Sequence, residues 1–359
     1  MEKRIGFFIS DNKWKNYHRW AYNTAKALYV EGYEVFVITP RQSKLHTRLK
    51  GYGMKVVNYK KSGIMLLDFY RLSKICKKYK LDNLVINYPD DIRVSALVAK
   101  YCLLEKLVFR RGTIPVKTKN KIDNYLAKKY ISSVITNSKA NMESIRANKS
   151  SVFRKKPIRV VYNGIQEKFS GSKMEGFDYH RNGELIVGLS NCANNSAFCT
   201  RFFEYLKKAD IDKESITFLI FPDRKHGSYF SGNVKQISLP KSVRLTGQEA
   251  HLSEFMSKID VYLSPVVENS FNYSLIYAMA QKKPVIGFSE GSNPEVIGDQ
   301  ENGFLVENDN FDELLEKIET LRDDKLRRSM GENGLRTVKN TFNFREAAHQ
   351  IQKILAVND

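Results

Sequence analysis

Cysteine is scarce in this sequence, and no long apolar run is present. The four cysteines (Cys76, Cys102, Cys192 and Cys199) among 359 residues form no CxxC pair. Their scatter argues against a disulfide-stapled scaffold and a zinc site, and is typical of reduced thiols in a cytoplasm. No stretch approaches the ~20 apolar residues that span a bilayer. The short apolar run at 5–9 meets charged and polar residues at once, so it predicts a buried first strand and not a signal peptide.

Acidic residues are also scarce, but only in the first half of the chain. Residues 1–165 hold 35 Lys/Arg and 11 Asp/Glu, a balance of +24, whereas residues 166–359 hold 24 and 28, a balance of −4. A lysine-rich proteome is one explanation, although such a bias should raise the positive charge of both halves equally. The asymmetry favours an anionic partner for the first half: a membrane surface, a pyrophosphate or a nucleic acid. We expect no nucleic acid, because no helix-turn-helix, finger or aromatic RNA-reading motif is present.

Short β-branched or aromatic runs alternate with longer amphipathic stretches. In the first half, strands are predicted at 4–10, 34–39, 55–58, 83–87, 107–110 and 132–136, and helices at 17–31, 67–80, 91–103 and 119–130. After Asn163-Gly164 and a polar stretch, strands are predicted at 185–189, 217–221, 243–245, 260–264 and 284–288, and helices at 196–208, 250–258, 272–281, 311–322 and 324–340. Such alternation predicts βαβ units and parallel sheets.

The pattern predicts an α/β chain with two tandem Rossmann-like parallel-sheet domains and a cleft between them. The first domain is expected at 1–164, the second at 165–340, and a C-terminal helix at 341–359 that packs back on the first domain. Ligands of such sheets bind outside the carboxyl ends of the strands.

One run of short motifs in the second half has a distinctive order and spacing. Its segments are Val243–Gln248, Ile259–Pro265, Glu268–Ala280, Lys283–Ile286, Gly291–Ile297 and Asn302–Val306. The run resembles the nucleotide-sugar domain of retaining glycosyltransferases of family 4, and Val161–Ile165 resembles that family's interdomain junction. In the first half, the segments that resemble some bacterial polysaccharide-assembly members are Asp91–Arg93, Phe109–Gly112, Pro115 and Thr136–Ser138. The resemblance implies a GT-B fold, a nucleotide-sugar donor and no metal or other cofactor.

The helix that opens near Asn272 is the candidate donor site, because a helix N-terminus favours phosphate and small polar residues let it approach the backbone. An ordinary capped helix start is the alternative. The resemblance assigns donor binding to Asn191, Gln248, Asn269, Ser270, Phe271, Asn272, Tyr273, Ser274 and Tyr277.

The sequence departs from the family pattern in three places. Where the family has two carboxylates eight residues apart, this chain has Asn269 and Tyr277, and Glu268 lies one residue early. The usual lysine after the first strand of the second domain is missing from 188–195. In place of paired glycines, the loop at 11–19 carries Lys13, Lys15, Arg19 and a lone His18, a residue type that is more often structural than catalytic.

Arg110 and Arg111 end an apolar strand, and Asp91 follows the preceding one. Arginine forks onto phosphate or carboxylate, so both clusters are expected to line the cleft. The expected catalytic residues are Asp91, Arg110, Arg111 and Glu268, with no metal ligand. A structural ion pair between Asp91 and one of the arginines is the alternative.

These observations predict a glycosyltransferase that acts on a saccharide or lipid-linked saccharide acceptor, with retention, in cell-surface polysaccharide or lipopolysaccharide assembly. A GT-B pseudoenzyme that binds an acceptor or a partner enzyme is the alternative, and a nucleotide-sugar epimerase is a third hypothesis. The basic stretches 71–80 and 117–129, interleaved with tyrosines, suit an anionic bilayer. We therefore expect a cytoplasmic protein that is peripheral at the inner face of the cell membrane.

Overall fold

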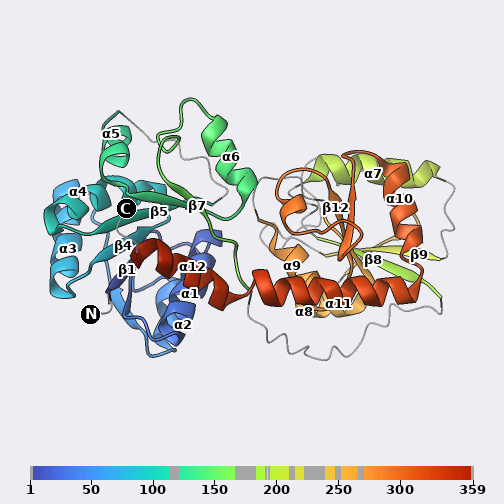
Figure 1. Cartoon of the computed structure of the whole chain (residues 1–359), viewed down its shortest axis with the longest axis horizontal. Helices are drawn as coiled ribbons and strands as arrows, with labels where there is room; N and C mark the ends of the chain where they lie inside the picture. Colours follow the sequence, from blue (N-terminus) through green and yellow to red (C-terminus); the bar gives the residue numbers. More distant parts are fainter. Residues whose placement is uncertain are drawn as a thin grey trace. The chain divides into compact units, whose positions relative to one another are not determined.

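The protein divides into two units in a computed structural model (Figure 1). Unit 1 comprises Met1–Gly164 and Asn343–Asp359, and unit 2 comprises Ile165–Phe342. The structure describes residues 3–112, 121–165, 183–190, 192, 195–209, 215–221, 239–246, 252–265 and 271–356. Each unit is a parallel sheet with helices packed against it, so the predicted α/β class with two parallel-sheet domains is confirmed.

Unit 1 is built on a seven-stranded sheet with strand order β3-β2-β1-β4-β5-β6-β7, in which every neighbouring pair is parallel. Its strands are β1 (Ile5–Phe8), β2 (Val35–Thr39), β3 (Lys55–Asn58), β4 (Asn83–Ile86), β5 (Lys106–Arg110), β6 (Ser133–Thr136) and β7 (Ile158–Val160). The strands from β1 to β6, except β3, are buried along their whole length, as is typical of a parallel sheet covered on both faces.

Two hydrophobic clusters hold the helices of unit 1 on the sheet. The helices are α1 (Asn16–Val30), α2 (Lys44–Lys50), α3 (Met65–Lys78), α4 (Ile92–Cys102), α5 (Lys121–Tyr130), α6 (Lys139–Ala147) and α12 (Phe344–Ala356), with a 3-10 turn η1 (Pro89–Asp91). α3, α4, α5 and α6 share one cluster, and α1, α2 and α12 share the other. The short helices α2 and α6 were not predicted; each is preceded by a serine, Ser43 or Ser138, that caps its first turn.

Unit 2 repeats the architecture with a six-stranded sheet of order β10-β9-β8-β11-β12-β13, again parallel throughout. Its strands are β8 (Leu185–Leu189), β9 (Ile216–Ile220), β10 (Val243–Leu245), β11 (Val261–Leu263), β12 (Val285–Phe288) and β13 (Gly303–Val306). Its helices are α7 (Ser196–Lys208), α8 (Leu252–Lys258), α9 (Tyr273–Ala280), α10 (Phe311–Thr320) and α11 (Asp324–Thr341), with a 3-10 turn η3 (Asn293–Glu295). β13 was not predicted as a strand.

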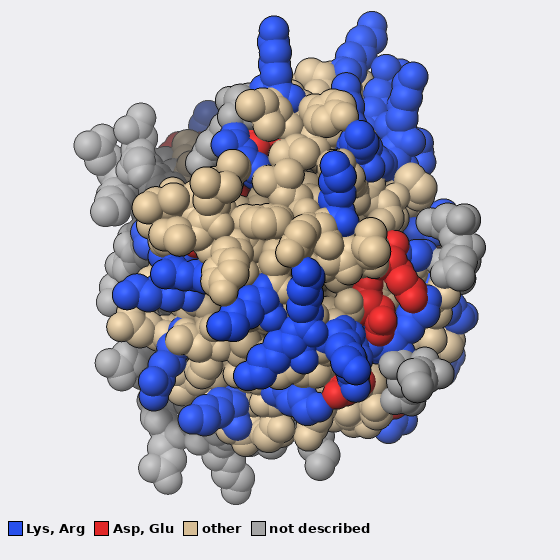
Figure 2. Space-filling view, turned by 90° about the vertical axis from the view of Figure 1, so that its left-hand side faces the viewer, with Lys and Arg blue, Asp and Glu red and all other residues tan. Residues whose placement is uncertain are grey.

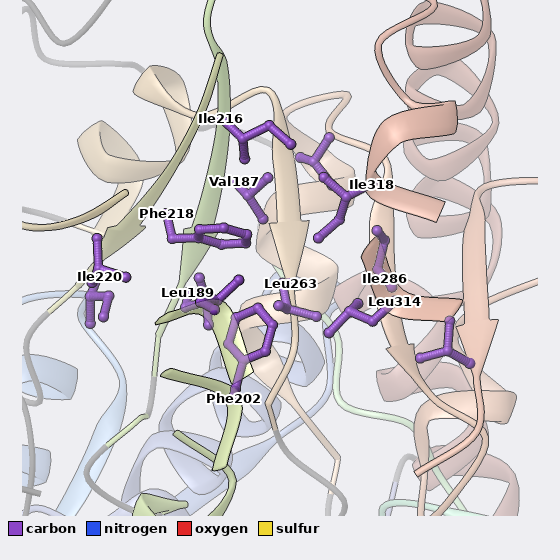
Figure 3. Packing of buried hydrophobic residues seen from close by; sticks show 14 of the residues in the cluster. Val187, Leu189, Phe202, Ile216, Phe218, Ile220, Leu263, Ile286, Leu314 and Ile318 are labelled. Atoms are coloured by element: carbon purple, nitrogen blue, oxygen red, sulfur yellow. The ribbon is translucent and has the colours of Figure 1, made fainter. Parts of the chain in front are cut away.

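The core of unit 2 fills the space between its central strands and two helices. Phe202 of α7 and Leu314 and Ile318 of α10 are fully buried against side chains of β8, β9, β11 and β12, such as Leu189 and Ile286 (Figure 3). This packing fixes β8 and β11 side by side at the centre of the sheet.

The C-terminal helix α12 belongs to unit 1. It packs against α1, and its Ala348, Ile351 and Leu355 side chains join the cluster of that helix. Its last carbonyls are satisfied by the sheet, because Lys106 Nζ donates a hydrogen bond to Ile354 O at 2.9 Å. Among the described residues, no helix has the length and apolarity that a membrane span requires.

Replacing Gly164 with Ala should disturb the docking of α12. A Cβ atom at residue 164 lies 2.4 Å from the Asn343 carbonyl oxygen and 2.6 Å from Phe344 N, and backbone atoms cannot rotate away. We expect a loss of about 1–3 kcal/mol in the free energy of unfolding of unit 1, the usual cost of overpacking. The two tryptophans, Trp14 and Trp20, both belong to unit 1, so urea unfolding followed by tryptophan fluorescence measures it selectively.

The matched control is Gly51→Ala, since residue 51 has a helical φ of −64° and a Cβ there meets nothing closer than 3.7 Å. Equal midpoints for the two variants would contradict a tight contact between Gly164 and the start of α12.

Candidate functional site

The carboxyl ends of β1 and β4 are tied together through a buried carboxylate. Ser10 follows β1, and its backbone N donates a 2.9 Å hydrogen bond to Asp91 Oδ2 in η1. Lys61 Nζ donates to Ser10 Oγ at 3.3 Å. Asp91 is only 2% exposed, and this burial raises the pKa of its carboxyl to about 7, although Ser10 and Lys61 act in the opposite direction.

The alternative that Asp91 forms an ion pair with an arginine does not hold in this structure. Within the described parts of the chain, neither Arg110 nor Arg111 forms an ion pair with Asp91. The Asp91 carboxylate therefore positions the chain after β1 by binding Ser10. Its catalytic role stays a prediction.

Arg110 and Arg111 end β5 in different environments. Arg110 is 4% exposed; its Nη2 lies 3.5 Å from Asn163 Oδ1 and its guanidinium lies 5.1 Å from the Trp20 ring centre. Arg111 is partly exposed, but its Nε is buried and has no hydrogen-bond partner among the residues that the structure describes. Burial also lowers the pKa of Arg111. Arg111 is the stronger candidate of the two, because its guanidinium is partly exposed and can reach an anionic ligand, whereas Arg110 is buried.

The loop at 11–19 uses its histidine for structure. Lys15 N donates to His18 Nδ1 at 3.4 Å, so the proton lies on Nε2, which donates to Asp11 O at 2.9 Å. His18 is fully buried, and desolvation lowers its pKa, so the ring is neutral. Lys15 forms an ion pair with Asp11 at 3.4 Å. His18 thus caps α1 and holds the loop.

An aromatic pair lies at the same edge and was not predicted. The Tyr17 and Tyr88 rings stack with centres 5.7 Å apart and planes at 24°, and Asn87 Nδ2 donates to Tyr17 O at 2.8 Å. Tyr17 OH donates to the Asp11 carboxylate, and Tyr88 is partly exposed. The only signal in the sequence was the position of Asn87 and Tyr88 directly after β4. Tyr17 is buried, so the partly exposed ring of Tyr88, beside hydrogen-bonding groups, is the face of this pair that suits a sugar ring.

In unit 2, the start of α9 lies against the carboxyl ends of the central strands. Asn272 caps the helix: its Oδ1 accepts from Ser274 N at 3.0 Å, and its Nδ2 donates to Ser264 Oγ, directly after β11, at 2.8 Å. The cap that the alternative hypothesis proposed is therefore present. It anchors the positive end of the helix dipole at the sheet edge where ligands of parallel sheets bind.

A second polar contact at this edge was missed by the sequence analysis. Ser190 follows β8, and its hydroxyl lies 2.7 Å from the hydroxyl of Tyr262 in β11. Tyr262 is fully buried, which raises its pKa, and its hydroxyl also interacts with Ser274 and Asn272. A tyrosine inside an apolar strand and a serine after each of two strands were the available signals. Together these hydroxyls fix the first turn of α9 on β8 and β11.

Three aromatic residues predicted for donor binding surround the same helix start. Phe271 is 5% exposed and packs against Phe342 with ring centres 5.4 Å apart. Tyr273 and Tyr277 are partly exposed and stack at 6.3 Å and 28°. Phe271 thus supports the turn, whereas the two tyrosines form one partly exposed aromatic strip.

Five predicted site residues lie outside the described residues: Asn191, Gln248, Glu268, Asn269 and Ser270. The described residues contain no group of three His, Cys, Asp or Glu side chains arranged to hold a metal ion.

Comparison with known proteins gives matches over most of the chain. The family model described as "Glycosyltransferase Family 4" matches residues 18–169, and the model described as "Glycosyl transferases group 1" matches residues 186–324. The chain is a glycosyltransferase of the GT-B class. A curated relative from Campylobacter jejuni, N-acetylgalactosamine-N,N'-diacetylbacillosaminyl-diphospho-undecaprenol 4-alpha-N-acetylgalactosaminyltransferase, is 25% identical over 299 residues, 79% of each protein.

Solved structures show that the glycosyltransferase shares its fold along its whole length. A glycosyltransferase from Rickettsia africae superposes with a TM-score of 0.80 at 18% identity over 100% of both chains. The Anabaena protein HepE, in complex with UDP, gives a TM-score of 0.75 at 17% identity over 98% of this chain and 99% of that one.

Replacing Asp91 with Asn should change how the stability of the glycosyltransferase depends on pH. The folded-state pKa of Asp91, about 7, is raised above the ordinary value of 3.8, so its favourable contribution is complete below pH 3.8 and is lost as the pH rises through 7. The stability of Asp91→Asn relative to the parent should therefore increase between pH 4 and pH 8, by up to about 4 kcal/mol.

Urea unfolding at several pH values, followed by tryptophan fluorescence, measures this difference. The neighbouring variant Asp90→Asn, at an exposed position, controls for the loss of one surface charge. A pH-independent difference for Asp91→Asn would show that the carboxyl is ionised throughout.

Replacing Arg111 with Lys should impair the glycosyltransferase without unfolding it. Lysine keeps the positive charge but cannot form the two parallel hydrogen bonds of a guanidinium. The transfer rate should therefore fall roughly 10–1000-fold if Arg111 binds an anion. Arg154→Lys, at an exposed site with no side-chain partner among the described residues, is the matched control. Unchanged rates for both variants, with unchanged melting temperatures, would return Arg111 to a structural role.

Proposed function

We propose that the protein transfers a sugar, with retention, from a nucleotide-sugar donor to a lipid-linked saccharide acceptor in cell-surface polysaccharide assembly. The observation that carries the proposal is the anchored start of α9 at the carboxyl ends of β8 and β11. HepE, whose fold is similar, has been solved with UDP and with UDP-glucose. The relative from C. jejuni acts on a diphospho-undecaprenol-linked saccharide, which supports an acceptor of that class.

The donor diphosphate is assigned to unit 2. The positive end of α9 faces the developing negative charge of the leaving phosphates, and Tyr273 and Tyr277 offer aromatic faces for the nucleoside or the sugar. Tyr277 stands where family members carry a carboxylate for the ribose diol. At this position the Tyr277 ring can stack on the donor and its hydroxyl can form a hydrogen bond, in place of the two hydrogen bonds that a carboxylate forms with the diol.

Retention accounts for the lack of a strong base at the described site. The bond from the anomeric carbon to the diphosphate breaks, and the acceptor oxygen bonds to the same face of the sugar. The acceptor proton passes to a departing phosphate oxygen, so neither a histidine base nor a metal is needed. The neutral, buried His18 is consistent with this mechanism.

The acceptor is assigned to unit 1, at the edge formed by Tyr17, Tyr88, Lys61 and Arg111. The partly exposed Tyr88 ring, which stacks on the buried Tyr17, suits a sugar ring, and the partly exposed Arg111 suits a phosphate of a lipid diphosphate. The excess positive charge of residues 1–165 would hold this unit on the anionic inner face of the cell membrane, where such an acceptor lies. This location makes the protein peripheral to the membrane and cytoplasmic.

UDP and UDP-sugars should stabilise the protein, and transfer should survive a chelator. At a ligand concentration 100-fold above Kd, binding adds about 2.7 kcal/mol and should raise the Tm of unit 2 by about 5–10 °C. Transfer of radiolabelled sugar to a bacterial lipid extract should proceed equally with and without EDTA.

Adenosine diphosphate serves as the control nucleotide for the thermal shift. Loss of transfer in EDTA, restored by manganese or magnesium, would overturn the metal-independent mechanism. Stabilisation by UDP without transfer from any UDP-sugar would instead support a binding protein that has lost catalysis.

A further inference from the structure

Exposed apolar side chains concentrate on one part of unit 1. Among the described residues, thirteen large apolar side chains are exposed, and seven of them lie at the start of α3 or the end of α4. We call these seven residues the apolar ridge: Ile64, Met65, Leu66, Leu67, Tyr70, Tyr101 and Leu103. Leu66 is 72% exposed and Leu103 is 87% exposed. Clustering of this kind marks an interaction surface, whereas scattered exposed residues do not.

The two helices present the apolar ridge as one surface. The Phe69 ring of α3 meets the Tyr101 ring of α4 edge to face, with centres 5.3 Å apart, and Lys77 Nζ lies 3.8 Å from the Tyr101 ring centre. Between the helices runs an open groove of about 530 Å³, lined by Met65, Leu66, Phe69, Leu97, Lys100 and Tyr101. The ridge and groove are thus held by contacts within the fold.

Leu103 shows that the exposure is not explained by packing. It follows α4 with φ of 54° and ψ of 44°, the left-handed region where glycine or asparagine is favoured and a bulky side chain is strained. Its side chain is the most exposed of the thirteen. A leucine at this position costs backbone strain and gains no buried contact within unit 1, which favours a contact with something outside it.

Lysines surround the apolar ridge. α3 carries Arg71, Lys74, Lys77 and Lys78 and a single acid, Asp68, which is 3% exposed and accepts hydrogen bonds from Ser62 and Gly63. Lys74, Lys77, Lys78 and Lys100 form no ion pair with any acidic residue that the structure describes. The face of unit 1 that carries α3 and α4 shows Lys and Arg side chains around a largely uncharged area (Figure 2).

We propose that the apolar ridge inserts into the interface of an anionic lipid bilayer while the surrounding lysines contact lipid phosphates. Aliphatic and tyrosine side chains ringed by lysine match the transition from acyl chains to headgroups. Protein–protein interfaces are depleted in lysine, so the composition of the rim favours lipid over a protein partner. This inference deepens the proposed function by naming the residues that contact the membrane. It rests on the proposed function only for the explanation of why the protein would bind a membrane.

Tryptophan reporters in the full-length protein test the insertion. Leu66→Trp places a fluorophore on the ridge, and Val30→Trp places a matched one at a site that is 66% exposed in the same unit, outside the ridge. After the emission of the parent, which comes from Trp14 and Trp20, is subtracted, vesicles of phosphatidylcholine with 40% phosphatidylglycerol should shift the emission of Leu66→Trp to the blue. Lipids brominated on the acyl chains should quench the Leu66→Trp emission and leave that of Val30→Trp unquenched.

Sedimentation with the same vesicles measures how much the ridge side chains contribute to the affinity for the membrane. Leu66→Ser and Leu103→Ser should each weaken vesicle binding about tenfold, because burial of a leucine side chain is worth at least that factor. Val30→Ser should bind like the parent. High salt should weaken all variants alike, since it screens only the lysines.

Vesicle binding without acyl-chain quenching, or equal binding by the Ser variants and the parent, would overturn the insertion. A concentration-dependent dimer of the parent that Leu66→Ser abolishes, without any vesicle binding, would assign the ridge to a second copy instead. Both readouts are independent of nucleotide, so they can fail while UDP still stabilises the protein, and the reverse also holds.

Discussion

The structure depends on one constraint. In a parallel sheet that is covered on both faces, polar side chains and ligands can be accommodated only beyond the ends of the strands. Along β1, β4, β5, β8 and β11 every residue is buried, so the central strands of both sheets are closed to a ligand on either face. The chain leaves each strand at its carboxyl end and turns there into a helix or loop, and polar residues converge at that edge. Ser10 and Asp91 do so in unit 1, and Ser190 and Ser264 do so in unit 2.

The two edges are built differently, and the difference matches their proposed ligands. The edge of unit 2 is a network of neutral hydroxyl and amide groups around Tyr262 that fixes a helix start. The edge of unit 1 combines a carboxyl with a raised pKa, an aromatic pair and the partly buried guanidinium of Arg111. A rigid neutral frame suits precise orientation of a donor, while aromatic and cationic groups suit an anionic saccharide carrier.

Much of the fold could be predicted, because strong alternation between apolar runs and amphipathic stretches determines βαβ units. The start of α9 could be placed within one residue, since Asn272 is a typical cap. The side-chain contacts between neighbouring strands at the sheet edges could not be predicted. Asp91 follows β4, which has β1 on one side and β5 on the other, and the sequence does not say which neighbour it faces. It turns to Ser10 beyond β1 and not to the arginines of β5, because a backbone amide at 2.9 Å satisfies a fully buried carboxyl without a second buried charge.

The contact between Ser190 and Tyr262 could not be predicted either, because it joins residues that lie 72 positions apart. The apolar ridge was missed because consecutive apolar residues such as Leu66 and Leu67 are usually taken for core.

Hydrogen–deuterium exchange of the full-length protein, with and without UDP, tests most directly whether ligands bind at these edges. UDP should slow amide exchange in peptides that cover 271–281, the anchored start of α9. Peptides at the opposite ends of the same strands, such as those around Leu185 and Val261, should be unchanged. Protection confined to those opposite ends, or to the helices α10 and α11, would contradict the account.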